Sequence, residues 1–128
     1  MHEPIPDRDE EIAHEVIGTA IEVHRLLGPG FLEKIYERAL VHELALRRVS
    51  TQPQKEILVP YKDILIPGQQ LDILVCERVI LELKVVDALA PIHEAQLLSY
   101  LNATRLRLGL LINFNVRILK DGIKRLVR

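Results

Sequence analysis

The most informative pattern in the chain is a pair of apolar runs that charged residues interrupt. The runs cover residues 71–75 and 79–86, and they contain Asp72, Glu82 and Lys84. Side chains on a β-strand point to alternate faces of the sheet. Charged side chains are rarely buried in apolar strands unless they are paired or bind a metal. The pattern therefore predicts two neighbouring strands that carry a charged site.

One hairpin register keeps the apolar side chains of the two runs together. It has a three-residue loop at 76–78 and these opposed pairs: Val75 with Val79, Leu74 with Ile80, Ile73 with Leu81, Leu71 with Leu83, Asp72 with Glu82, and Gln70 with Lys84. A slip of one residue would move every side chain to the wrong face. Opposed Cβ atoms lie roughly 4.5–5.5 Å apart. The apolar pattern alone therefore predicts two adjacent carboxylates.

Two adjacent carboxylates repel each other, and one takes up a proton unless a cation lies between them. Mg²⁺ is the simplest such cation, because it binds one or two carboxylates together with water and substrate phosphate. Lys84 follows on the same face, where it can stabilise an anion or adjust a water. The alternative is that ILELKV is a strand with one solvated face, since charged residues are common on exposed strand faces.

The remaining pattern predicts a single domain over residues 1–128 with a mixed α/β (α+β) fold. The expected helices are one that Asp7 or Asp9 caps and that runs to Leu27, one at 31–48 and one at 91–103. The other expected elements are an extended, flexible arm at 1–8, a linker at 49–54, a hairpin of strands 55–61 and 64–66, a turn at Pro67-Gly68, and strands at 106–114 and 123–127. Pro60 indicates an edge strand or a bulge.

The composition is typical of a globular protein without disulfide bonds or membrane spans. A chain of 128 residues with 48% hydrophobic residues can bury a core, and its net charge of −1 gives no overall basic signal. The single cysteine excludes an internal disulfide framework and favours a reducing cytoplasm. No apolar run is long enough for a membrane span or a signal core. We therefore expect a cytoplasmic protein with no membrane association.

The charged residues match the motif of a known family. Asp72, nine intervening residues and Glu82-Leu83-Lys84 resemble the D…E-x-K motif of the PD-(D/E)XK nuclease superfamily. More narrowly, Gly30-x-x-Glu33-x-x-Tyr36 resembles the motif of the GxxExxY proteins, a prokaryotic family assigned to that superfamily. The similarity continues through HEAQLLSYL and GLLINF, and it covers the chain from about Ile12 to Val127. One departure is Leu71, which stands where the superfamily's name has proline.

The resemblance implies a restriction-endonuclease-like αβββαβ core, in which helices flank a mixed sheet. It implies Glu33, Asp72 and Glu82 as metal ligands, together with the backbone carbonyl of Leu83. Lys84 would position or activate the attacking water, and Gln96 would orient Lys84 or the substrate. The implied cofactor is Mg²⁺ or Mn²⁺. Glu33 has a second interpretation, since an acidic residue at a helix start complements the positive end of the helix dipole.

Three hypotheses follow for the function. The first is a Mg²⁺-dependent nuclease that hydrolyses DNA phosphodiester bonds in repair, recombination or defence, as a homodimer or with a partner protein. Its weaker predicted contacts with nucleic acid are Tyr36, Tyr100, Arg105, Arg107, Arg117, Lys120, Lys124 and Arg125. The second is a non-catalytic module that keeps the nuclease fold and binds nucleic acid or protein. The third is a plain α/β domain with a charged strand face.

Overall fold

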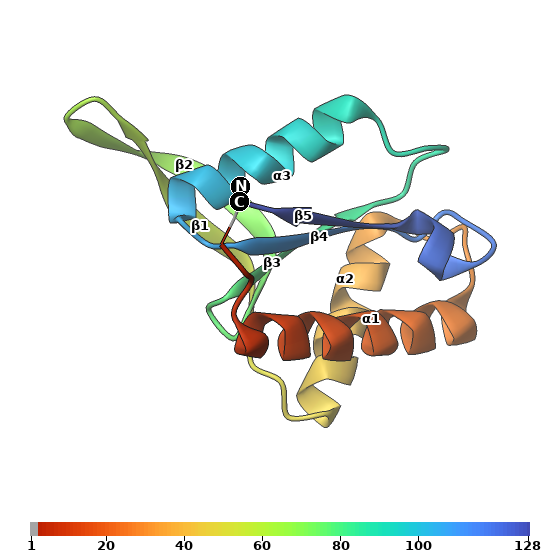
Figure 1. Ribbon diagram of the computed structural model, residues 1–128. Helices are drawn as coiled ribbons and strands as arrows, with labels where there is room; N and C mark the ends of the chain where they lie inside the picture. The colour runs from red at the N-terminus through yellow and green to blue at the C-terminus, as the bar shows by residue number, and fades with distance from the viewer. Residues whose placement is uncertain (1–2) are drawn as a thin grey trace.

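The computed structural model describes residues 3–128, and it contains helices on both faces of one sheet. The elements are α1 Asp7–Leu27, α2 Glu33–Leu46, β1 Thr51–Tyr61, β2 Ile64–Val75, β3 Val79–Lys84, α3 Pro91–Thr104, β4 Leu108–Asn113, the 3₁₀ helix η1 Leu119–Gly122, and β5 Ile123–Val127. α1 and α2 cover one face and α3 covers the other (Figure 1). The predicted α+β fold is confirmed, with the order αβββαβ running from α2 to β4.

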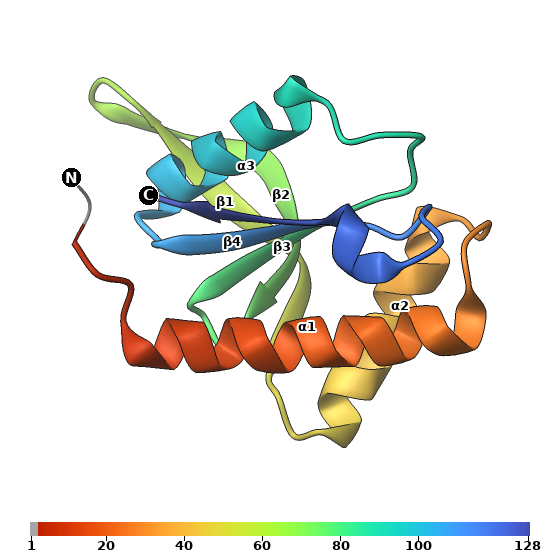
Figure 2. The same ribbon diagram turned by 45° about the vertical axis from the view of Figure 1, so that its right-hand side comes forward.

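The sheet is mixed, and its strands lie in sequence order from β1 to β5. β3 and β4 are parallel, whereas the other neighbouring strands are antiparallel. α3 provides the long connection that two parallel neighbours require. β1 and β2 extend past α3 as a projecting hairpin (Figures 1 and 2). β1 is an edge strand, as Pro60 predicted.

Two apolar layers hold the helices to the sheet. The larger layer lies between the sheet and α1 and α2, and the smaller one lies beneath α3. Every residue of β4 is buried, because helices cover both of its faces. Gly109 in β4 lets α3 pack closely, since a Cβ there would lie 2.9 Å from the Leu97 side chain. Within residues 3–128, no helix combines the length and apolar character that a bilayer span requires.

The first helix begins close to the predicted place, but its N-cap is Pro6 and not Asp7 or Asp9. α1 starts at Asp7, so two residues assigned to the arm at 1–8 are helical, and Met1 and His2 lie outside the described residues. The carbonyl of Glu3 accepts a hydrogen bond from Arg107 at 2.8 Å, and Ile5 packs against the core. These contacts connect the segment before the helix with the body of the domain.

The expected turn at Pro67-Gly68 is instead a bulge inside β2. Ile57 pairs with Gln69 and Val59 pairs with Ile66, so two residues of β2 face one residue of β1. Gly68 has φ +111°, a conformation that glycine adopts without strain. The expected linker at 49–54 is also wrong in part, because β1 already begins at Thr51.

The predicted register of the central hairpin is confirmed for three pairs. Val75 faces Val79, Leu74 faces Ile80 and Ile73 faces Leu81 across the expected loop. Leu71 departs from the prediction, since it belongs to the layer beneath α3 and not to the layer that contains Ile73. Leu71 pairs with Lys55 and Ile73 pairs with Pro53, but Gln54 between them has φ +51° and forms no pair in the ladder between β1 and β2. This interruption gives a physical reason for the change of face.

The central position of Leu81 leads to a stability prediction. Leu81 is 0% exposed in the larger apolar layer, whereas Ile92 on α3 is 70% exposed. Leu81→Ala should lower the free energy of unfolding by about 2–5 kcal/mol, because a cavity replaces the lost side chain. Ile92→Ala should change it by about 0.5 kcal/mol or less. Urea unfolding of the two variants measures the difference, and equal losses would contradict the assigned core.

Candidate active site

The two strand carboxylates each bind the backbone of the opposite strand. An Asp72 carboxylate oxygen accepts the Leu83 N–H at 2.8 Å, and a Glu82 carboxylate oxygen accepts the Asp72 N–H at 2.8 Å. The regular pairing of β2 with β3 ends one step earlier, at Ile73 and Leu81. Side chains therefore satisfy the N–H groups where the backbone ladder stops. The structure thus brings Asp72 and Glu82 together.

Burial strongly disfavours the charge on Glu82. The residue is 4% exposed, and loss of water together with repulsion from Asp72 raises its pKa to about 8. Burial also raises the pKa of Asp72, although the hydrogen bond from Leu83 opposes this effect. The pair therefore resembles other sites in which neighbouring carboxylates compete for one proton or need a cation between them.

Glu33 and Lys84 approach this pair from α2 and from the end of β3. Glu33 is exposed at the first helical residue, yet loss of water and the charge of Asp72 raise its pKa. Lys84 is half-buried, and its positive charge lowers the pKa of Glu33, Asp72 and Glu82. None of the ion pairs formed within residues 3–128 involves these four residues.

Asn113 holds the chain that follows Lys84. Its side chain accepts the Val86 N–H at 3.1 Å and donates to the Val86 carbonyl at 2.9 Å. The Lys84 carbonyl also accepts the Phe114 N–H at 3.0 Å. Asn113 is 1% exposed, so these bonds replace its contacts with water. The sequence analysis missed this positioning residue, although a lone asparagine at the end of an apolar run was a usable signal.

Tyr36 fixes the loop that leads into Glu33. Its hydroxyl donates to the Gly28 carbonyl at 2.5 Å and accepts the Phe31 N–H at 3.2 Å. Its ring stacks on Phe114 with 4.5 Å between the ring centroids. The side chain is 0% exposed, so the predicted contact of Tyr36 with nucleic acid is wrong. The tyrosine supports the site from inside the core.

Glu37 and Gln54 also adjoin the site, and the sequence analysis did not identify either of them. The Gln54 amide donates to Glu37 at 2.6 Å, and a hydrogen bond from Gln54 lowers the pKa of Asp72. Burial raises the pKa of Glu37. Glu37 lies one helical turn after Glu33, which was a signal for its placement. Nothing in the local sequence indicated that Gln54 would reach Asp72.

Gln96 lies one helical turn before Tyr100 on α3. The Tyr100 hydroxyl accepts a hydrogen bond from Gln69 at 2.8 Å. Loss of water, followed by the charges of Glu82 and Asp72, raises the pKa of Tyr100, while hydrogen bonds with Gln96 and Gln69 lower it. This arrangement places Tyr100 beside the carboxylate pair. The hydrogen bonds within residues 3–128 include none between Gln96 and Lys84, so the predicted role of Gln96 in orienting Lys84 gains no support here.

The basic residues predicted to contact nucleic acid divide into two groups. Three of them bind the chain itself: Lys124 with Glu94 at 3.3 Å, Arg125 with Glu10, and Arg107 with the Arg128 carbonyl at 2.8 Å. Lys124 and Arg125 remain exposed despite these ion pairs. The other three are exposed and form no ion pair within residues 3–128: Arg105, Arg117 and Lys120. The first group is less available to a ligand than the sequence suggested. In the described part of the chain, no three His, Cys, Asp or Glu side chains are grouped to hold a metal ion.

The raised pKa of Glu82 predicts a stability that falls as pH rises. Between the ordinary value of 4.5 and about 8, the folded chain retains a proton that the unfolded chain releases. Glu82→Gln cannot ionise and keeps an oxygen that can accept the Asp72 N–H. In EDTA the variant should exceed the wild type in free energy of unfolding by about 2–4 kcal/mol near pH 8.5, and by little near pH 4.5.

Denaturant unfolding across this pH range measures the difference, with Glu56→Gln as the exposed control. A wild type and a Glu82→Gln variant with parallel pH profiles would show that Glu82 ionises without penalty.

Removal of the Tyr36 hydroxyl should loosen the loop before Glu33. Tyr36→Phe keeps the stacked ring but leaves the Gly28 carbonyl and the Phe31 N–H without their partner. We expect a loss of about 1–3 kcal/mol in the free energy of unfolding. Hydrogen exchange should also become faster in residues 28–33 than in β4. Unchanged exchange in this loop would show that the hydroxyl does not hold it.

Comparison with known proteins agrees with this arrangement. The model of the PD-(D/E)XK nuclease superfamily matches residues 10–126. No curated protein and no solved structure gave a significant match. The matched region contains the whole αβββαβ order together with Asp72, Glu82 and Lys84. The narrower resemblance to the GxxExxY proteins stays a prediction. On the family match, this chain belongs to the PD-(D/E)XK nuclease superfamily.

Proposed function

We propose that this protein is a metal-dependent nuclease that hydrolyses phosphodiester bonds in DNA. The observation that carries the proposal is the buried pair of Asp72 and Glu82, with Lys84 beside it, in a chain of the nuclease superfamily. A strand face that is merely solvated would not bury Glu82 to 4% exposure. Such a concentration of perturbed carboxylates is typical of functional sites.

The donor set fits a hard divalent cation such as Mg²⁺ or Mn²⁺. Asp72 and Glu82 each direct one oxygen to a backbone N–H, which leaves the second oxygen of each for a metal. Burial raises the pKa of both carboxyl groups, and the charge of Asp72 adds to this effect at Glu82. No ion pair within residues 3–128 involves either group. Glu33 and the Leu83 carbonyl are the proposed further ligands. The bound ion would lower the pKa of a coordinated water and offset the charge of the phosphate.

The side chains around the pair have separate roles in the proposal. Lys84 stabilises negative charge as it develops on the phosphate oxygens, and it positions the attacking water. Tyr100 and Gln96 line the α3 side of the pair, where they orient the substrate. Asn113 and Tyr36 act indirectly, through the chain after Lys84 and the loop before Glu33.

Exposed basic side chains supply the proposed contacts with the DNA backbone. Arg105, Arg117 and Lys120 are exposed. Contacts of this kind neutralise phosphates and make binding weaker as the salt concentration rises. Lys124 and Arg125 would have to leave their partners Glu94 and Glu10 to join them.

The proposal predicts cleavage that depends on both metal and Lys84. Wild-type protein should cut labelled DNA with Mg²⁺ or Mn²⁺, and Lys84→Ala should cut it about a hundredfold more slowly or worse. Lys62→Ala, at the exposed tip of the projecting hairpin, is the matched control and should cut normally. The substrate panel contains duplex, single-stranded and branched DNA, with RNA of the same sequence.

Metal binding is tested in parallel by thermal unfolding. Mg²⁺ or Mn²⁺ should raise the melting temperature of the wild type, because a ligand that binds only the folded state stabilises it. The shift should vanish in an Asp72→Asn, Glu82→Gln double variant. No cleavage of any substrate, together with no metal-dependent shift, would favour the non-catalytic module. Full activity of Lys84→Ala would show that the site is assigned wrongly.

A further inference from the structure

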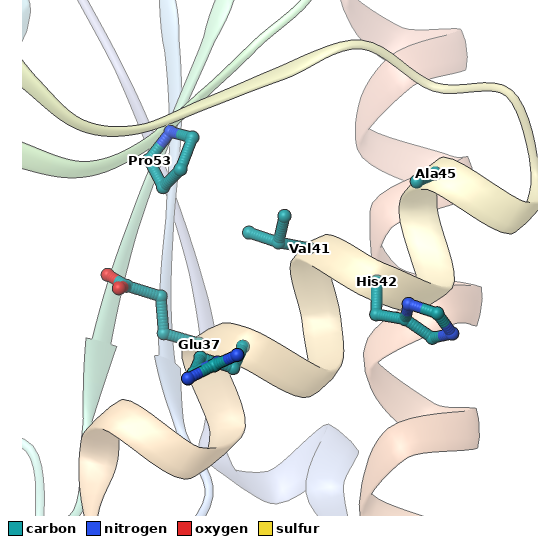
Figure 3. Close-up of a pocket in the computed structure, with 6 residues that line it drawn as sticks. Glu37, Val41, His42, Ala45 and Pro53 are labelled. Carbon is teal, nitrogen blue, oxygen red and sulfur yellow. The ribbon is translucent and has the colours of Figure 1, made fainter.

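A pocket beside the carboxylate pair has no role in the proposed cleavage chemistry. It lies between the exposed side of α2 and the start of β1, with a volume of about 410 Å³, and its lining residues are Glu37, Arg38, Val41, His42, Ala45 and Pro53. This volume falls within the usual range for small-molecule sites. Val41 points from α2 toward the Pro53 ring, and His42 points away from that ring (Figure 3).

The pocket is connected to the candidate active site through two side chains. Glu37 lines the pocket and accepts a hydrogen bond from the Gln54 amide at 2.6 Å. Gln54 lies between Pro53 and Lys55, which pair with Ile73 and Leu71, so it stands opposite Asp72, one of the proposed metal ligands. The pocket therefore adjoins Asp72 through Glu37 and Gln54. A nucleotide close to the scissile phosphate can reach the pocket without a long connection.

The chemistry of the lining favours a nucleobase over a phosphate. Val41, Ala45 and Pro53 present apolar surface, against which a flat ring can pack. The Glu37 carboxylate would repel a phosphate, but it accepts hydrogen bonds from base N–H groups. Arg38 supplies a guanidinium donor on the same pocket. Apolar walls with one carboxylate and one guanidinium suit a base that offers donors on one edge and acceptors on another.

Among the bases, guanine matches this set best. Its N1–H and 2-amino group are adjacent donors, which a carboxylate can accept together. Its O6 and N7 are acceptors, which an arginine can bind. Adenine and cytosine place a ring acceptor next to the amino group, and thymine has one N–H between two carbonyls. In a duplex the N1–H and the 2-amino group of guanine already pair with cytosine, so the pocket would take an unpaired guanine.

We propose that the pocket formed by Glu37, Arg38, Val41, Ala45 and Pro53 binds an unpaired guanine of the substrate strand, next to the phosphate that is cleaved. This inference rests on the proposed nuclease function, because that function supplies the nucleic acid. It goes further in naming a base and the residue that recognises it. Glu37 accepts the N1–H and 2-amino donors, while Gln54 holds the carboxylate in place.

The first test measures binding without cleavage. Wild-type protein in EDTA is titrated into fluorescent single-stranded oligothymidine that contains one central guanine, or one inosine in its place. The base of inosine differs from guanine only in lacking the 2-amino group. The guanine strand should bind about tenfold more tightly, the discrimination expected of a good two-bond contact to a base. Equal affinities would overturn the inference, whether or not the protein cuts DNA.

Variants on α2 assign the preference to the pocket. Glu37→Gln should bind the guanine and inosine strands equally, whereas Glu43→Gln on the same helix should keep the preference. Ala45→Gln fills the pocket from an exposed position and should also abolish it. If Glu37→Gln fails to fold, Ala45→Gln provides the result. A guanine preference that survives in the folded pocket variants would place the recognition elsewhere and overturn the inference.

Cleavage mapping separates this inference from the proposed function. In an active enzyme, a guanine moved by one position along an oligothymidine strand should move the main cleavage site by one position. A cleavage pattern that ignores the guanine would contradict the pocket while leaving the nuclease function intact. A guanine preference in binding with no cleavage would support the pocket and contradict the nuclease function.

Discussion

The exchange of hydrogen bonds between β2 and β3 is the interaction on which the candidate site depends. Asp72 uses its own N–H to hold Glu82 and its carboxylate to hold the N–H of Leu83. The backbone pairing of the strands ends there, and the two carboxylates accept the N–H groups of Asp72 and Leu83 in place of backbone carbonyls. A buried N–H without a partner would lower the free energy of unfolding by about 1–3 kcal/mol, so movement of either carboxylate away from its N–H is unfavourable. The backbone itself therefore fixes the positions of both acids.

Burial of the same two carboxylates makes the site a weak point in the stability of the fold. The N–H groups stabilise the carboxylates, but burial and mutual repulsion outweigh this help and leave the pKa of Glu82 near 8. Titratable groups with strongly shifted pKa values are common at functional sites. Lys84 offsets some of the repulsion, and it forms no ion pair with any residue of the described range 3–128. The ammonium thus remains available to another anion.

The sequence predicted the parts of the fold that local alternation controls. The three-residue loop and the register from Val75 to Ile73 followed from the faces of apolar residues, and the structure agrees. The alternation of apolar and polar residues gave wrong predictions where a single residue has irregular strand geometry. Gly68 forms a bulge where a turn was expected, and the positive φ of Gln54 accompanies the change of face at Leu71. Such events depend on the neighbouring strand, which the local pattern does not contain.

The candidate site was predictable to a similar extent. Asp72, Glu82 and Lys84 share one strand face, so the pattern found them. Tyr36 was misjudged, because its motif position says nothing about whether its hydroxyl faces solvent or the Gly28 carbonyl. Gln54 and Asn113 escaped notice because their roles arise from contacts that only the folded chain makes. Sequence spacing identified the acids, and tertiary packing determined which residues support them.

The short loop between β2 and β3 also bears on the order in which the site assembles during folding. Asp72 and Glu82 belong to one hairpin, so they can meet after closure of a very short loop. The clamp from Asn113 to Val86 requires α3 and β4 to be in place, and contacts between distant segments form more slowly. A partly folded chain would therefore contain the acidic pair before it fixes the chain after Lys84. The clamp on the chain after Lys84 would be among the last parts of the candidate site to form.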